Sequence, residues 1–140
     1  MKELKAEVSI NLRFSDTDAM GVIWHGNYLR FFEDAREAFG SDHKLTYLDI
    51  YNNGYFTPIV KSDIDYKSPI YYGEKVSVIA KYVPSAAAKI IFEYKVVNSS
   101  TGKICAVGTT IQVFLNAKER KLELNKPDFY LKWEKEHGIK

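Results

Sequence analysis

The chain has 140 residues, a formal charge of +2 and an ordinary globular composition, with ten tyrosines, eight phenylalanines and two tryptophans. This length supports a single domain over residues 1–140 with a substantial core. The small charge argues against a nucleic-acid or anionic-membrane partner. Because the N-terminus has no signal-like apolar core, no stretch could span a bilayer and the single Cys105 has no disulfide partner, we expect a cytoplasmic protein.

The first predicted element is a strand over residues 6–14, where apolar and polar side chains alternate. A loop follows, and then a long helix that we expect to end near Gly40. One broad face of this helix carries apolar side chains at steps of three and four, namely Tyr28, Phe31, Phe32, Ala35, Ala38 and Phe39. So many aromatic rings on one side need a large partner surface, and the strands downstream can supply it.

The rest of the chain reads mainly as short strands separated by turns. We expect a helix within residues 42–52, strands at 55–66 (broken near Pro58), 76–82, 90–96 and 103–115, and a terminal helix at 127–137. One strand, one long helix and then mostly antiparallel strands make an α+β fold. The aromatic helix should lie across one face of a single strongly curved sheet.

The loop before the long helix holds the residues with the clearest chemical potential, Asp16, Asp18, Gly21 and His25. An acid beside a helix N-terminus is useful, because the carboxylate can attack or take a proton while free N–H groups stabilise negative charge. The two aspartates and the histidine also allow a metal site, but no second histidine or cysteine stands at ligand spacing nearby, so we expect no metal. For Asp16 we favour a turn role, with hydrogen bonds to its own backbone.

A longer motif runs through this loop into the helix. Its positions are Phe14, Asp16, Asp18, Gly21, His25, Asn27 and Tyr28. The motif resembles that of the hot-dog-fold acyl-CoA thioesterases, in the branch of the 4-hydroxybenzoyl-CoA thioesterases, and weaker similarity covers most of residues 6–116. The resemblance implies a hot-dog fold, in which a curved antiparallel sheet wraps around one long central helix. It also implies a homodimer or homotetramer with the active site at the subunit interface.

The resemblance further implies hydrolysis of an acyl-CoA or acyl-carrier-protein thioester without metal or bound cofactor, coenzyme A being part of the substrate. Asp18 matches the catalytic carboxylate, either nucleophile or general base, and the backbone N–H of His25 faces the thioester oxygen. The residues expected to contact the substrate are Gly21, Trp24, Gly26, Asn27, Tyr28, Thr57, Pro58 and Ile59. Relatives hold CoA phosphates with basic residues near the start of the fourth strand, where this chain offers only Lys89; Lys61 and Lys67 from a partner subunit are further candidates.

Two other functions stay open from the sequence alone. A non-catalytic acyl-CoA-binding or scaffold protein would bind thioesters and release no thiol. A hot-dog hydratase or dehydratase would change an intact thioester by one water. The acyl group is also open, because Trp24, Tyr28, Tyr55 and Phe56 suit either an aromatic pocket or an alkyl tunnel. Cys105 lies among apolar strand residues, so we expect a core side chain and not a nucleophile.

Overall fold

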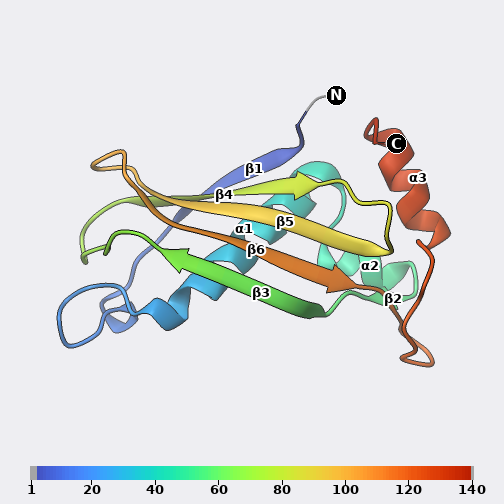
Figure 1. Ribbon diagram of the computed structural model, residues 1–140, viewed down its shortest axis with the longest axis horizontal. Helices are drawn as coiled ribbons and strands as arrows, with labels where there is room; N and C mark the ends of the chain where they lie inside the picture. The colour runs from blue at the N-terminus through green and yellow to red at the C-terminus, as the bar shows by residue number, and fades with distance from the viewer. Residues whose placement is uncertain (1–2, 140) are drawn as a thin grey trace.

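The computed structural model describes residues 3–139 and has the predicted α+β architecture (Figure 1). Five antiparallel strands form one sheet in the order β1-β4-β5-β6-β3, with β1 at Lys5–Ile10, β3 at Ile59–Tyr66, β4 at Val76–Val83, β5 at Lys89–Asn98 and β6 at Ile104–Val113. A separate pair joins β2 (Tyr55–Phe56) to β7 (Leu115–Asn116). The helices are α1 (Tyr28–His43), α2 (Tyr47–Asn52) and α3 (Asp128–Glu136), and the short 3-10 turns η1 (Phe14–Asp16) and η2 (His25–Asn27) precede α1. Within residues 3–139, none of the helices has both the length and the apolar character that crossing a membrane requires.

Helix α1 lies across one face of the sheet, and its aromatic side fills the core (Figure 1). The predicted apolar face is buried, with no exposed surface on Phe31, Phe32, Ala35 and Phe39. Phe32 stacks on Tyr94 of β5, with ring centroids 4.3 Å apart. Gly108 of β6 permits this close approach, because a Cβ at that position would lie 2.5 Å from the Phe32 ring.

The end of α1 differs from the sequence-based expectation. The helix continues past Gly40 to His43 and stops where Lys44 takes up the left-handed conformation, with φ of 59°. Gly40 serves packing instead, since a Cβ there would lie 2.6 Å from the carbonyl oxygen of Leu45. The prediction that the helix stops at Gly40 was therefore wrong, because the close tertiary contact requires a glycine at this position and the helix continues through it.

The first strand is also shorter than predicted. It ends at Ile10, opposite Val76, where the neighbouring strand β4 begins. Beyond that point the alternating side chains have no sheet to face, and Phe14 is 75% exposed in the 3-10 turn that follows. Alternation alone cannot show where the partner strand starts.

The two ends of the sheet carry different elements (Figure 1). The loop of residues 11–24 and the start of α1 lie at one end, whereas α2, β2 and α3 gather at the other. Strand β3 is an edge of the sheet and runs between these ends, with Tyr66 near the loop and Ile59 at the far end. Seven steps of extended chain separate Ile59 and Tyr66 by about 23 Å.

A buried polar cluster attaches α3 to the far end of the sheet. Glu134 and Lys126 are both nearly buried and form an ion pair at 2.9 Å. The hydroxyl of Tyr82 donates to Glu134 at 3.3 Å and also pairs with the hydroxyl of Tyr130. Burial raises the pKa of both tyrosines, so their hydroxyls stay protonated. This cluster positions α3 away from the loop that holds Asp18.

Candidate active site

The loop that carries Asp18 folds back on itself before it reaches the helix. The Asp18 N–H donates to the Val22 carbonyl at 2.9 Å, and the Gly21 N–H donates to the Asp18 carbonyl at 3.0 Å. Gly21 has φ of +77°, a conformation that a residue with a Cβ adopts only with strain. The Met20 N–H donates to one oxygen of the Asp18 carboxylate at 2.8 Å. The turn therefore orients a half-exposed carboxylate while leaving its second oxygen free of this bond.

The helical stretch begins at His25, three residues after Val22, and runs through η2 directly into α1. Its first hydrogen bond runs from the Asn27 N–H to the Trp24 carbonyl at 3.0 Å. The N–H groups of His25 and Gly26 consequently have no acceptor inside the helix. Such leading N–H groups attract negative charge. The loop thus brings a carboxylate and an anion-stabilising helix start to the same end of the molecule.

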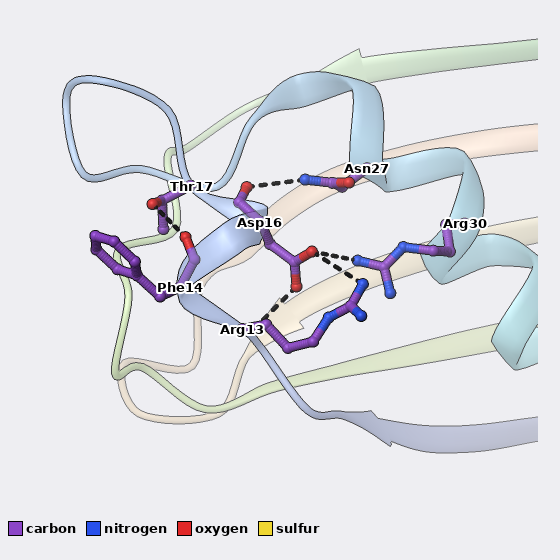
Figure 2. Close-up of polar contacts among 6 residues, drawn as sticks. All are labelled: Arg13, Phe14, Asp16, Thr17, Asn27 and Arg30. Atoms are coloured by element: carbon purple, nitrogen blue, oxygen red, sulfur yellow. Dashed lines mark hydrogen bonds and ion pairs between the residues drawn. The ribbon is translucent and has the colours of Figure 1, made fainter.

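Asp16 joins this loop to α1 through its carboxylate (Figure 2). The side chain is only 3% exposed, and it accepts the Arg13 N–H at 2.9 Å and the Arg30 guanidinium at 2.8 Å. Burial by itself would raise the pKa of Asp16, but the hydrogen bond from the Arg13 backbone and the charges of Arg30 and Arg13 outweigh it and leave this pKa lowered. The turn role predicted for Asp16 is confirmed, and the carboxylate stays ionised at neutral pH.

The backbone carbonyl of Asp16 makes a second connection to the helix start. It accepts the side-chain amide of Asn27 at 2.8 Å (Figure 2). It also accepts the N–H of Trp24 at 2.9 Å. In the sequence, Arg30 is only one of several charged residues between the apolar positions of the helix. No local signal could have found its role, because Asp16 and Arg30 meet only after the loop has folded.

The residues predicted to contact substrate fall into two groups, of which the first lies at this end of the sheet. Trp24 is half-exposed, and its ring lies so close to Gly26 that a Cβ there would be 2.3 Å from it. Tyr28 is buried, and burial raises its pKa to about 12. Tyr66, which the sequence did not single out as a site residue, donates its hydroxyl to the His25 carbonyl at 3.1 Å. Only an aromatic position at the end of a strand could have hinted at Tyr66.

The second group lies at the far end of the sheet in the same chain and comprises Thr57, Pro58, Ile59 and Lys89. The Thr57 carbonyl accepts the Gln112 side chain at 2.7 Å, and Ile59 pairs with Gln112 in the sheet. Lys89 is exposed at the start of β5, and the residue after it, Ile90, pairs with Gln112. The length of β3 separates this group from His25, so one chain does not bring it to Asp18.

The histidines and the single cysteine are the other side chains with metal-binding or nucleophilic chemistry. Within residues 3–139, no three His, Cys, Asp or Glu side chains lie close enough together to hold a metal ion. Cys105 is buried, which confirms the predicted core position, and burial raises the pKa of its thiol. A thiol that resists ionisation is a poor nucleophile.

An antiparallel sheet packed on one long helix, with a carboxylate-bearing loop at the start of that helix, defines a hot-dog enzyme of the thioesterase type. The family model of the thioesterase-like superfamily matches residues 12–133. The chain is 30% identical over 129 residues to YneP of Bacillus subtilis, provisionally assigned as an acyl-CoA thioesterase, covering 90% of this chain and 93% of that protein. It is also 30% identical over 117 residues to a 1,4-dihydroxy-2-naphthoyl-CoA hydrolase of Crocosphaera subtropica, covering 79% and 82% of the two proteins.

The structural comparison agrees with the sequence comparison. The structure of the DHNA-CoA thioesterase from Staphylococcus aureus aligns with a TM-score of 0.83 and 28% identity, covering 96% of this chain and 91% of that one. The chain belongs to the thioesterase-like superfamily, which confirms the predicted hot-dog fold, and it is a thioester hydrolase.

Proposed function

We propose that the protein hydrolyses an acyl-CoA thioester to a free acid and coenzyme A, with Asp18 as the catalytic carboxylate. The observation that carries this proposal is the loop geometry, in which the Met20 N–H orients the Asp18 carboxylate at the end of the molecule where the N–H groups of His25 and Gly26 have no acceptor among residues 3–139. The relatives named above act on CoA thioesters by their names, which favours CoA over a carrier protein as the donor. The chemistry needs neither a metal nor a bound cofactor.

Hydrolysis of a thioester needs few catalytic groups, because sulfur donates little electron density into the carbonyl and the thiolate is a good leaving group. As a general base, Asp18 takes a proton from water, the oxygen adds to the carbonyl carbon, and the C–S bond breaks to release the thiolate. As a nucleophile, Asp18 itself adds to that carbon and displaces the thiolate, and water then cleaves the resulting anhydride. In both routes the developing oxyanion would lie at the His25 N–H, and one such donor stabilises the transition state by about 3 kcal/mol.

A second copy of the chain is part of the proposal. Strand β3 is an edge strand and exposes Val60 and Tyr66. Antiparallel pairing of two β3 strands would bring Thr57, Pro58 and Ile59 of the partner subunit beside His25, so that residues separated in one chain serve one site. Lys89 of the partner subunit would then be available for CoA phosphates. We expect a homodimer that pairs again into a homotetramer, and sedimentation as a stable monomer at micromolar concentration would contradict this part.

A cytoplasmic location belongs to the same proposal. The single Cys105 is buried and has no disulfide. A single cysteine without a disulfide is typical of proteins in compartments that keep thiols reduced.

The decisive experiment measures thiol release from short-chain, long-chain and aromatic acyl-CoAs by the wild-type protein and by Asp18→Asn. Asparagine keeps the shape of the side chain but is neither a useful base nor a nucleophile, so kcat should fall at least about a hundredfold while binding persists. Asp16→Asn is the matched control and should lower thermal stability more than kcat.

The same samples separate the other functions. Full activity of Asp18→Asn would remove the carboxylate from the mechanism. Binding of acyl-CoA without thiol release by the wild-type protein would favour the binding protein, and a mass change of one water on the intact thioester would favour the hydratase.

A further inference from the structure

Tyr66 lies at the end of the edge strand β3 that is nearest to the start of α1. Its backbone is part of the sheet, since Tyr66 pairs with Ala106 of β6. The N–H of the next residue, Lys67, donates to the Cys105 carbonyl at 2.8 Å and holds the chain where the strand ends. A side chain on a paired strand is positioned more precisely than one on a loop. Tyr66 therefore gives the start of the helix a fixed contact with the sheet.

The ring of Tyr66 packs against the first residues of the helical stretch. Its centroid lies 5.1 Å from that of Tyr28, with the two ring planes at 80°. It lies 6.1 Å from the centroid of the His25 ring, with the planes at 79°. Aromatic pairs favour such edge-to-face arrangements. Because Tyr28 is itself buried, it fixes the orientation of the half-exposed Tyr66 ring and thereby the position of its hydroxyl.

The Tyr66 hydroxyl donates to the backbone carbonyl of His25 at 3.1 Å. This carbonyl also accepts the N–H of Tyr28 inside the helical turn, so both of its lone pairs are used. A peptide unit is planar and trans, and its carbonyl and its N–H point in opposite directions. A donor that fixes the His25 carbonyl consequently fixes the direction of the Gly26 N–H as well.

The Gly26 N–H is one of the two leading N–H groups without an acceptor among residues 3–139, at the end of the molecule that carries Asp18. Hydrogen bonds to the His25 carbonyl draw electron density through the amide, and linked hydrogen bonds strengthen one another. The Tyr66 hydroxyl therefore makes the Gly26 N–H a stronger donor, in addition to fixing its direction.

We propose that Tyr66 is a positioning residue for thioester hydrolysis, whose hydroxyl orients and polarises the His25–Gly26 peptide so that the Gly26 N–H becomes a second donor to the oxyanion. This role rests on the proposed function. Tyr66 acts through the peptide and needs no contact with the thioester. Its effect grows as negative charge develops on the thioester oxygen, so it stabilises the transition state more than the bound substrate.

The kinetic test compares wild type with Tyr66→Phe on the acyl-CoA that wild type cleaves fastest among short-chain, long-chain and aromatic acyl-CoAs. Phenylalanine keeps the ring and removes only the hydroxyl. We expect kcat to fall roughly 3- to 10-fold with KM unchanged, as for one neutral hydrogen bond lost from the transition state. Tyr72→Phe is the matched control, because Tyr72 is also half-exposed and contacts the same loop through its N–H, which donates to the Gly21 carbonyl at 3.4 Å. It should leave both constants unchanged.

A second measurement needs no substrate. Labelling the carbonyl carbon of histidine and the nitrogen of glycine selects two peptides in the sequence, His25–Gly26 and His137–Gly138. In Tyr66→Phe the NMR signals of His25–Gly26 should shift, because its carbonyl loses a hydrogen bond. The signals of His137–Gly138 should stay in place and serve as the internal reference.

Three results would overturn the proposal. If Tyr66→Phe lowers Tm but leaves kcat unchanged, the hydroxyl serves stability alone. If KM rises while kcat stays the same, Tyr66 contacts the substrate directly. If the His25–Gly26 signals do not shift, the hydroxyl does not polarise this peptide. Absence of thiol release by wild type would refute the hydrolase itself, whereas thiol release that Tyr66→Phe leaves unchanged would refute only the role of Tyr66.

Discussion

Replacing Asp16 by asparagine removes the charge that links the loop of residues 11–24 to α1, while the side chain keeps nearly the same shape. The buried carboxylate accepts one backbone N–H and one close guanidinium nitrogen, from Arg13 and Arg30. A hydrogen bond to a charged group contributes roughly 1.5–3 kcal/mol. The side chains of Arg13 and Arg30 are 61% and 38% exposed, which limits each ion pair to less than about 1 kcal/mol. Because asparagine still accepts the N–H, we expect a net loss of about 2 kcal/mol, or roughly 7 °C in Tm.

The pH dependence of this loss of stability identifies the charge of Asp16 as its cause. The pKa of Asp16 is lower in the folded protein than its ordinary value of 3.8, so the folded state favours the ionised form. The resulting stability is fully present above the unfolded pKa and is lost as pH falls through the folded pKa. The difference between wild type and Asp16→Asn should therefore be constant from pH 7 to about pH 5 and shrink below about pH 4.

Urea unfolding followed by circular dichroism between pH 7 and pH 3 measures this difference. Asp34→Asn removes the same charge from an exposed position on α1 and should change stability by less than about 0.5 kcal/mol. If Asp16→Asn is as stable as wild type at pH 7, or if its loss of stability is the same at pH 3, ion pairing of Asp16 does not explain how the loop is attached to α1.

Two further predictions concern CoA binding and the attachment of α3. Lys89→Ala should raise KM and leave kcat nearly unchanged, with a smaller effect in added salt, because an exposed cation near phosphates contributes ground-state binding that salt screens; an unchanged KM would place the phosphates elsewhere. Lys126→Met leaves the buried Glu134 carboxylate without its cation, so urea unfolding should show a loss of about 3 kcal/mol. Wild-type stability of Lys126→Met would mean that Glu134 gains its stabilisation from Tyr82 alone.

The sequence by itself determined the features that depend on neighbouring residues. The spacing of apolar side chains from Tyr28 to Phe39 is a local property of a helix, and it predicted which face would be buried. The strand order along the chain, the break at Pro58 and the terminal helix followed in the same way. The loop motif around Asp18 also led to the family, because the resemblance rests on residue types at fixed spacings.

Only the tertiary structure decided the features that join distant segments. Strand β1 ends at Ile10 because β4 begins opposite it, and Gly40 lies inside the helix because the backbone of Leu45 packs against it. The pairing of Asp16 with Arg30 spans fourteen residues, so neither side chain reveals its partner in the sequence.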